Sequence, residues 1–456
     1  MRILLVVPRV SGGRARLCPN LGILTVAALT PDNVDVVVVD ENVNRIDFDE
    51  ECDLVGITAM THSVLRAYEV SAAFRERGKT TVLGGFHPSL VPDEAIQHCD
   101  SVVVGEAEGV WPRLVEDFAD GKLQKFYRRE TFVDLKAQPV PRRDLIRRGA
   151  YKLPNTIETG RGCPFGCNFC SVTTFYGRKY RLRPIADVIA DIVTFRGKLM
   201  FIVDDNVIGS PAHAKELFHA LVPYGKLWIG QASLNLSRDP ELLDLAARSG
   251  CIGLFMGFES LSPESLAEAG KTHNSVQRYE EDVKRIRDRG ISIHGAFIFG
   301  FDHDDESIFD RTIDFVKKSK LDSASFSTLT PFPGTPTFDK LESEGRLLTR
   351  DWSKYGGAVF QPKLMSRDRL DEGCRRAWRE CYSLRSLVGR LATRKRLWYI
   401  HAALNIGYRL SINGSSRLCV GDLRSFHSLL RVVAELTSAP SASGTPRLEV
   451  RTLVAG

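Results

Sequence analysis

The sequence of 456 residues predicts an α/β fold in two parts, a doubly wound open sheet followed by six β/α units. Short β-branched runs alternate with amphipathic helical stretches through the first 130 residues, and a second alternating series begins at Asn155. The composition, 43% hydrophobic and 26% charged, is ordinary for a globular chain with more than one core. It argues against a disordered, collagenous or disulfide-scaffold protein.

The strands of the N-terminal part, residues 1–130, are near-continuous apolar runs, as in parallel sheets that are buried on both faces. The predicted strands are Arg2–Val7, Val34–Val39, Leu54–Thr58, Thr81–Leu83 and Ser101–Val104. Helical stretches at 21–29, 63–77, 92–97 and 110–118 separate them. Ligands of such sheets bind at the carboxyl ends of the strands. A charged, proline-containing stretch over 131–154 has little periodicity and is interpreted as a linker.

The second part, predicted over 155–345, has six strand and helix pairs, which fit a partial or full (β/α) barrel better than another small open sheet. Its predicted strands are Asn155–Thr159, Lys198–Val203, Leu227–Ala232, Ile252–Gly257, Ile291–Phe299 and Ala324–Leu329. Residues 346–456 form a third region, helical and arginine-rich over 365–410, with a tail at 437–456 that we expect to be mobile. Its basic stretch is typical of a solvated face, although the apolar residues 397–400 after it could rest on anionic lipid.

Charge and cysteine usage restrict the class of partner and the compartment. The net charge is +6, with 62 basic and 56 acidic residues, and no segment is typical of a nucleic-acid-binding module. No run of 18 apolar residues would form a membrane-spanning helix, and the N-terminus is interpreted as a first strand rather than a secretion signal. Ten cysteines without a secretory segment indicate a reducing cytoplasm, in which clustered thiols bind metal.

The strongest motif is GRGCPFGCNFC at 160–170, directly after the first strand of the second series. Cys163, Cys167 and Cys170 stand at i, i+4 and i+7 on a glycine-containing loop, so their thiolates can converge on one inorganic centre, zinc or an iron–sulfur cluster. Structural zinc needs a fourth ligand, and residues 171–190 contain no Cys or His. A [4Fe–4S] cluster held by three cysteines leaves one iron open for a small molecule. Zinc with a distant fourth ligand is the alternative.

This loop resembles the radical S-adenosylmethionine (SAM) superfamily, whose signature is CxxxCxxC with an aromatic residue before the last cysteine, here Phe169. The segment YGRKYRLRP at 176–184 strengthens the resemblance. It implies that the open iron binds SAM, with Phe169 against the adenine. It also implies SAM contacts at the strand ends, from Asp204, Gln231 and Glu259, the last at the ribose. A polar helix cap is an equally good interpretation of Asp204.

The N-terminal sheet has no GxGxxG after its first strand, which weighs against a dinucleotide, and its polar and glycine residues gather at strand ends instead. The segments TAMT at 58–61, GGFHP at 84–88 and GEAE at 105–108 resemble the cobalamin-binding radical SAM proteins, a group with hopanoid and natural-product methylases and the anaerobic porphyrin cyclase. The resemblance implies a Rossmann-like cobalamin-binding domain. The cobalamin contacts that it implies are Thr58, Thr61, Gly84, Gly85, His87, Gly105 and Glu106. The DxHxxG histidine that ligates cobalt in other corrinoid proteins is absent.

Together these residues favour a cobalamin-dependent radical SAM methyltransferase acting on an unactivated carbon of a lipid or specialised metabolite. The resemblance implies three cofactors, [4Fe–4S], SAM and cobalamin, and an external electron donor of the flavodoxin or ferredoxin type. One alternative is a radical cyclase or rearrangement enzyme without methyl transfer. Another, from a different class, is a non-catalytic iron–sulfur electron-transfer or sensing protein, which would need a fourth cluster ligand.

Overall fold

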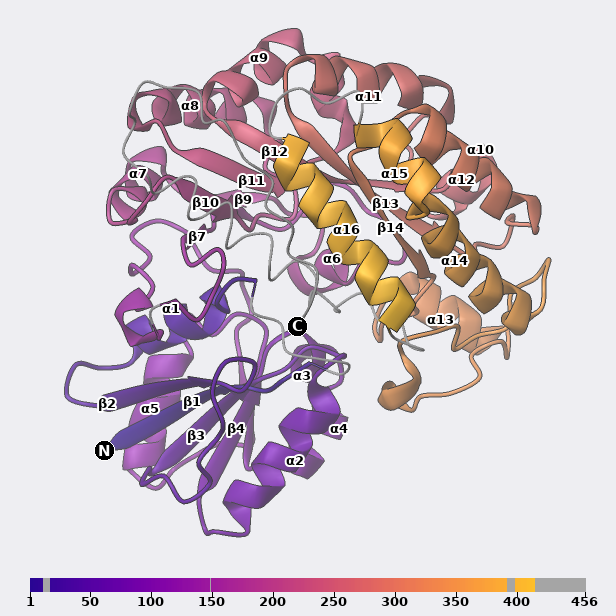
Figure 1. The fold of residues 1–456 in the computed structure, drawn as a ribbon. Helices are drawn as coiled ribbons and strands as arrows, with labels where there is room; N and C mark the ends of the chain where they lie inside the picture. Colours follow the sequence, from indigo (N-terminus) through magenta and orange to yellow (C-terminus); the bar gives the residue numbers. More distant parts are fainter. Residues whose placement is uncertain (11–16, 148, 392–397, 415–456) are drawn as a thin grey trace, which may run out of the picture.

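The computed structural model describes residues 1–10, 17–147, 149–391 and 398–414, and it contains two parallel sheets (Figure 1). The first has the strand order β2-β1-β3-β4-β5-β6. Its strands are β1 (Arg2–Val7), β2 (Asp35–Asp40), β3 (Leu54–Thr58), β4 (Thr80–Gly84), β5 (Ser101–Val104) and β6 (Phe126–Arg128). All neighbouring pairs are parallel, as the apolar runs predict. The edge strand β6 is too short to stand out in the sequence.

Helices cover both faces of this sheet. On one face α1 (Leu21–Leu29) and α5 (Trp111–Ala119) pack against alternate residues of the strands, such as Leu5 and Val103. On the other face α2 (Val64–Arg75) packs against the residues between them. This is the doubly wound arrangement, with the strand ends left open for a ligand.

The second sheet has the order β14-β13-β12-β11-β10-β7, again all parallel. Its strands are β7 (Thr156–Ile157), β10 (Leu199–Ile202), β11 (Leu227–Gln231), β12 (Cys251–Glu259), β13 (Ser292–Phe299) and β14 (Ser323–Thr328). Its edge strands β7 and β14 do not pair with each other in the described chain, so the six units form a partial barrel. The helices on its outer side are α7 (Ile185–Ile192), α8 (Pro211–Leu221), α9 (Pro240–Arg248), α10 (Pro263–Glu268), α11 (Tyr279–Asp288) and α12 (Ser307–Lys318). The predicted fold class is confirmed.

The first strand of the second series differs from its predicted extent. The strand predicted over 155–159 is only two residues long, because Gly160–Arg161 leaves the sheet as β8 and pairs antiparallel with β9 (Arg181–Leu182). This small ribbon holds the cysteine loop between its strands. The loop runs from Cys163 to Cys170, and α6 (Ser171–Tyr176) follows it.

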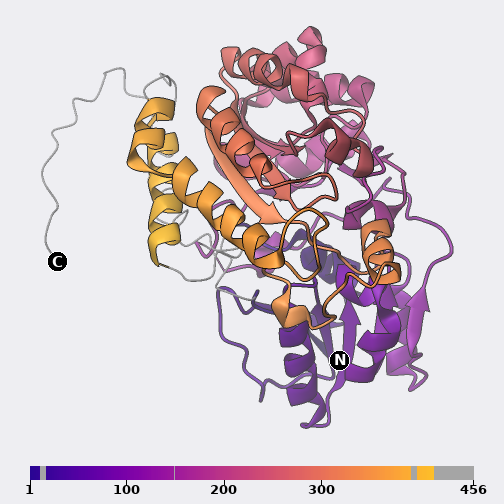
Figure 2. The ribbon, with the colours of Figure 1, turned by 90° about the vertical axis from the view of Figure 1, so that its right-hand side faces the viewer.

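The region after residue 345 first returns to the N-terminal sheet. Trp352, Tyr355 and Val359 belong to the same buried cluster as α2, together with Phe338 of α13 (Pro336–Ser343). The helices predicted over 365–410 then follow as α14 (Arg367–Cys381), α15 (Leu384–Leu391) and α16 (Trp398–Gly414), at one outer edge of the molecule in Figure 2. The tail at 437–456 lies outside the described residues. None of the described helices is long and apolar enough to cross a membrane.

Candidate active site

The cysteine loop is fixed to the barrel through its backbone. Asn168 donates its main-chain N–H to the Ala269 carbonyl (2.9 Å), and its side-chain amide donates to the Glu268 carbonyl (2.7 Å). Cys167 is buried, whereas Cys163 and Cys170 are partly exposed. These contacts hold the three thiols on one short loop at the carboxyl end of the sheet.

The donor set fits an iron–sulfur cluster in chemistry. Burial raises the pKa of Cys167 to about 11, with the nearby Cys170 thiol adding to the shift and Lys271 opposing it. Burial also raises the pKa of Cys163. Thiols in this state become ligands by exchanging their protons for metal, and thiolates select zinc and iron–sulfur centres. No three His, Cys, Asp or Glu side chains of the described chain are grouped so that they could hold a single metal ion.

Asp204 is the second residue after β10, but its carboxylate faces Thr159, between β7 and β8. It is fully buried and accepts hydrogen bonds from the backbone N–H (2.6 Å) and the hydroxyl of Thr159. Burial raises the pKa of Asp204 to about 7, against the hydrogen bonds from Thr159. The Gln231 amide donates to the Asp204 carbonyl at 3.4 Å. The side chain of Asp204 therefore links the segment between β7 and β8 to the end of β10 and caps no helix, contrary to the sequence-based alternative.

Glu259 ends β12 with a left-handed backbone, φ = +64°, beside a shift in register with β13. Backbone strain of this kind in a non-glycine residue is concentrated at functional sites. Its carboxylate forms a buried ion pair with Lys271. A Cβ at Gly257 would collide with both side chains, so the glycine makes room for the pair. Lys271 carried no recognisable sequence signal, yet it lies close enough to Cys167 to oppose the rise that burial causes in the pKa of that thiol.

Phe169 is the remaining residue of the predicted SAM set. Its ring is partly buried and meets Phe301 edge-on, with ring centroids 6.0 Å apart. The four predicted residues therefore all lie on the cysteine loop or at the carboxyl ends of β10, β11 and β12.

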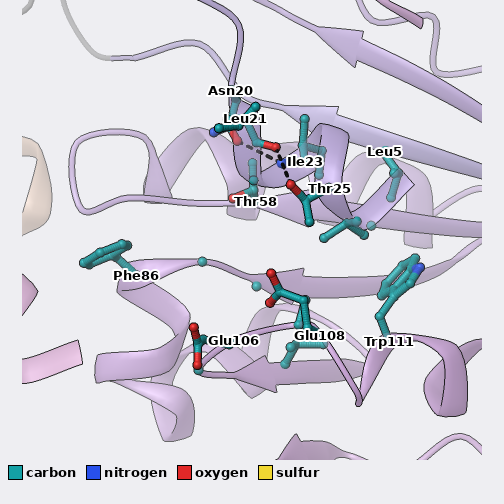
Figure 3. Close-up of a pocket in the computed structure, with 18 of the residues that line it drawn as sticks. Leu5, Asn20, Leu21, Ile23, Thr25, Thr58, Phe86, Glu106, Glu108 and Trp111 are labelled. Atoms are coloured by element: carbon teal, nitrogen blue, oxygen red, sulfur yellow. Dashed lines mark hydrogen bonds between the residues drawn. The ribbon is translucent and has the colours of Figure 1, made fainter. Parts of the chain in front are cut away.

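A cavity of about 330 Å³ opens at the carboxyl edge of the N-terminal sheet (Figure 3). Of the predicted cobalamin contacts, five line it: Thr58, Gly84, Gly85, Gly105 and Glu106. Gly85 has φ = +99°, and a Cβ there would lie 2.8 Å from the Ala59 carbonyl oxygen, so only glycine fits this turn. We call these five residues the cradle, and its glycines let a ligand approach the backbone closely.

The cavity continues as an apolar slot between the sheet and its helices. Leu5, Gly56, Val82 and Val103 line this part, together with Trp111 and residues of α1. In Figure 3 Trp111 lies at one end of the cavity and Phe86 at the other. Leu5, Gly56, Val82 and Val103 are mid-strand positions, which the pattern of polar residues at strand ends could not indicate.

Two predicted contacts, Thr61 and His87, do not line the cavity. His87 is fully buried, with Nδ1 3.1 Å from the Thr61 hydroxyl and Nε2 3.5 Å from a Glu94 carboxylate oxygen. Its ring meets Trp352 edge-on at 4.9 Å. The histidine of the GGFHP segment thus joins the N-terminal sheet to the C-terminal region in this structure.

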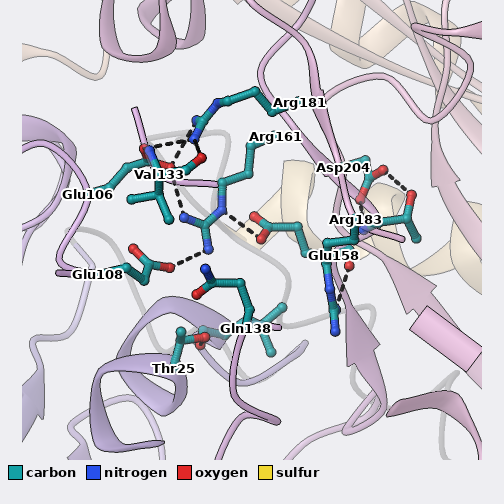
Figure 4. Close-up of polar contacts among 12 residues, drawn as sticks. Thr25, Glu106, Glu108, Val133, Gln138, Glu158, Arg161, Arg181, Arg183 and Asp204 are labelled. Carbon is teal, nitrogen blue, oxygen red and sulfur yellow. Dashed lines mark hydrogen bonds and ion pairs between the residues drawn. The ribbon is translucent and has the colours of Figure 1, made fainter. Parts of the chain in front are cut away.

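Ion pairs connect the cradle to the cysteine loop (Figure 4). Arg161, two residues before Cys163, pairs with Glu106 (2.8 Å), Glu108 (2.6 Å) and Glu158 (2.7 Å). Arg181 of β9 also pairs with Glu106, at 2.8 Å. We call these five residues the domain clamp. Because the Glu106 carboxylate is held by both arginines, it reaches the cavity as part of this clamp and not as a free side chain.

Three aromatic rings pack together where α6 meets the N-terminal sheet. Phe86 stacks on Phe175 with centroids 4.3 Å apart, and Tyr176 meets both rings edge-on. All three line the cavity. They join α3 (Phe86–Leu90), which begins after Gly85, to α6, which follows Cys170.

The fold and these sites define a class of protein: a radical SAM barrel fused to a B12-binding domain. The Radical SAM superfamily model matches residues 157–316, and the B12 binding domain model matches residues 12–115. A bacteriochlorophyllide d C-12(1)-methyltransferase of Chlorobaculum tepidum is 33% identical over 84% of this chain and 88% of its own length. The hopanoid C-2 methylase of Rhodopseudomonas palustris is 29% identical over 74% of this chain and 67% of its own length.

Solved structures share the fold at low identity. The radical SAM methyltransferase TsrM of Kitasatospora setae, with tryptophan substrate and a SAM analog, has a TM-score of 0.66 at 18% identity and covers 96% of this chain and 100% of its own. The cobalamin-dependent enzyme OxsB, with aqua-cobalamin, has a TM-score of 0.69 at 15% identity and covers 95% of this chain and 75% of its own.

The chain therefore belongs to the cobalamin-binding radical SAM family and is an enzyme of its methyltransferase group. Its cofactors are a [4Fe–4S] cluster, SAM and cobalamin. The family predicted from the cysteine loop and the strand-end segments is confirmed, and the iron–sulfur carrier without catalysis is set aside.

Proposed function

We propose that this enzyme methylates an unactivated carbon of a lipid or specialised metabolite, with a large apolar molecule as substrate. The observation that carries the proposal is the domain clamp, because Arg161 ties the cobalamin cradle to the backbone two residues from Cys163. A cluster with SAM supplies a carbon radical, and cobalamin supplies the methyl group. Methylation of a carbon radical requires that the cluster with SAM and the cobalamin both lie near the same substrate molecule. The relatives that act on bacteriochlorophyllide and hopanoid support the substrate class.

At the cluster, we propose Cys163, Cys167 and Cys170 as the iron ligands. In the folded chain, Lys271 adds a buried positive charge beside this thiolate-rich loop. Lys271 holds the Glu259 carboxylate in place, and we propose that this carboxylate accepts hydrogen bonds from the ribose hydroxyls of SAM. We propose that Phe169 contacts the adenine of SAM. Gln231, which donates to the Asp204 carbonyl, and Asp204, which holds Thr159, are proposed to position the strand ends and not to contact SAM directly.

At the corrin, the five lining residues Thr58, Gly84, Gly85, Gly105 and Glu106 form the proposed seat. We propose that the slot between Leu5, Val82 and Trp111 takes the nucleotide tail of cobalamin, which leaves the cobalt without its own base. No histidine lines the cavity in the described part of the chain. The protein therefore offers no imidazole there as a replacement ligand. Thr61 and His87, which do not line the cavity, are proposed to support the turn at Gly85 through their mutual hydrogen bond.

We also propose that the enzyme works in the cytoplasm with a flavodoxin- or ferredoxin-type donor. The cluster needs one electron from outside for each radical that it forms, and a small one-electron carrier can supply it. All nine cysteines that the structure describes are free thiols, in keeping with a reducing compartment.

The test is product analysis under anaerobic conditions. Reconstituted protein with SAM, a low-potential reductant and a candidate apolar substrate should form 5′-deoxyadenosine and S-adenosylhomocysteine in equal amounts, with a product heavier by one methylene. Formation of 5′-deoxyadenosine without S-adenosylhomocysteine would instead favour a cyclase or rearrangement. The two cyclase relatives, at 27% and 26% identity, make this the second candidate.

A further inference from the structure

The cavity that contains the cradle has a second side, which the barrel part of the chain supplies. We call it the barrel side, and its residues are Glu158, Arg161, Phe175, Tyr176 and Val203. The two sides meet in direct contacts, since Arg161 pairs with Glu106 of the cradle at 2.8 Å. The structure describes all four residues that were predicted to contact SAM, and none of them lines this cavity. The ligand that the cradle holds is therefore the one that the barrel side meets.

Arg161 supplies the positive charge of the barrel side, and its guanidinium is already fully engaged (Figure 4). Its Nε, Nη1 and Nη2 atoms donate to carboxylate oxygens of Glu158 (2.7 Å), Glu106 (2.8 Å) and Glu108 (2.6 Å). A phosphate or carboxylate group entering here would meet Glu108 and Glu158 at a like-charge cost, without a free cation to offset it. The barrel side therefore selects a neutral group.

Two polar groups of the barrel side have no hydrogen-bond partner within the described chain. Glu158 uses its Oε2 atom on Arg161, whereas its Oε1 atom accepts nothing. The Tyr176 hydroxyl is also unpartnered, although its ring packs against Phe86 and Phe175. Burial raises the pKa of Tyr176, and the nearby charge of Glu158 raises it further, so this hydroxyl is protonated at neutral pH. A hydrogen-bond donor thus lies close to an open acceptor in the cavity.

We propose that the Tyr176 hydroxyl and the Glu158 carboxylate bind one carboxamide side chain of the corrin ring. A carboxamide is neutral, and it offers a carbonyl oxygen to the hydroxyl and an N–H to the carboxylate. Such side chains stand around the rim of cobalamin. The contact ties the corrin to the barrel, which the cradle glycines cannot do because they have no side chains. The inference rests on the corrin seat of the proposed function and adds two residues from outside the N-terminal sheet.

The test is the affinity of the cluster-loaded, cobalamin-free protein for hydroxocobalamin, measured by absorbance titration. Tyr176→Phe removes only the unpartnered hydroxyl, so it should leave the unfolding midpoint unchanged and weaken binding about five-fold. Glu158→Gln keeps an acceptor for Arg161 but loses the charge, and it should weaken binding about ten-fold. Tyr224→Phe is the matched control, since Tyr224 lies in the short helix after α8 and is 41% exposed. It should bind as the unchanged protein does.

Diaquacobinamide is a second probe, because it keeps the carboxamides of the corrin rim but lacks the nucleotide tail. Tyr176→Phe and Glu158→Gln should weaken its binding by the same factors as they weaken that of hydroxocobalamin. A loss confined to hydroxocobalamin would assign the two side chains to the nucleotide tail and overturn the proposal.

Circular dichroism and cluster content establish that each variant is folded. If hydroxocobalamin binds the unchanged protein and both variants with equal affinity, the inference alone is overturned, and the pair faces another molecule, such as the substrate. If the unchanged protein does not bind hydroxocobalamin, the corrin seat of the proposed function fails together with the inference.

Discussion

Arg161 joins the proposed cobalamin cradle to the cysteine loop, and its removal tests that connection. The side chains of Arg161, Glu106 and Glu108 are only 10%, 5% and 9% exposed. In Arg161→Met, Glu108 loses its arginine while staying buried, whereas Glu106 keeps Arg181. Removing one partner of a buried ion pair costs about 3–5 kcal/mol, because the other charge stays desolvated. We expect a loss of unfolding free energy in this range.

Urea unfolding of the cofactor-free protein, followed by tryptophan fluorescence, measures this effect. Glu108→Gln leaves Arg161 two carboxylate partners and should cost only about 1–2 kcal/mol. Arg142→Gln, which removes an exposed pair with Asp144, is the matched control and should cost less than about 1 kcal/mol. If Arg161→Met is as stable as the Arg142 variant, the clamp does not stabilise the protein and the reasoning fails.

The clamp also has a pH dependence of known sign. Burial alone would raise the pKa of Glu106, but hydrogen bonds from Arg181, Val133 and Arg161 bring it below its ordinary value. A group with a lowered folded-state pKa stabilises the fold above its unfolded pKa, roughly 4.3 for Glu, and that stability is lost as the pH falls through the folded value. We expect Glu106→Gln to flatten the acid limb of the stability curve relative to the unchanged protein.

The other predictions concern the two cofactor sites. Replacing Cys163, Cys167 and Cys170 together by alanine should abolish a redox-active [4Fe–4S] centre and all SAM cleavage; stoichiometric tetrahedral zinc in the unchanged protein would contradict this. Glu259→Ala should weaken SAM binding by about 1–3 kcal/mol, the cost of a lost charge-assisted hydrogen bond, while cluster content survives. Unchanged SAM affinity in the folded variant would reject the ribose assignment. Gly85→Val should block cobalamin uptake without loss of the cluster, and normal uptake would place the corrin elsewhere.

The fold was predictable because its signals are local. Strands buried on both faces are almost continuously apolar, as in Arg2–Val7, where only the first residue is polar. In the helices between them, apolar residues recur every three or four positions. The cysteine loop is equally local, with three ligands within eight residues. The prediction was wrong in the length of a short strand, β7, where the chain leaves the sheet after two residues.

Contacts between distant segments were not predictable from one sequence. Glu106 and Arg161 are 55 residues apart, and neither position shows which charged partner it will meet. The same holds for Lys271 and for Trp352, which lies 258 residues from the carboxylate that accepts its N–H. In GGFHP, the glycines indicated a tight turn at the cavity, but the pattern could not show that His87 points behind it. Side-chain direction depends on the packed neighbours.

The central claim about how this enzyme holds its methyl donor is that the corrin sits on the five strand-end residues, with its nucleotide tail in the apolar slot and no protein imidazole on its cobalt. Electron paramagnetic resonance of cob(II)alamin bound to the protein tests it most directly. We predict a base-off spectrum without superhyperfine splitting from an axial nitrogen. Nitrogen splitting in that spectrum, or a failure to bind cobalamin at all, would contradict the claim.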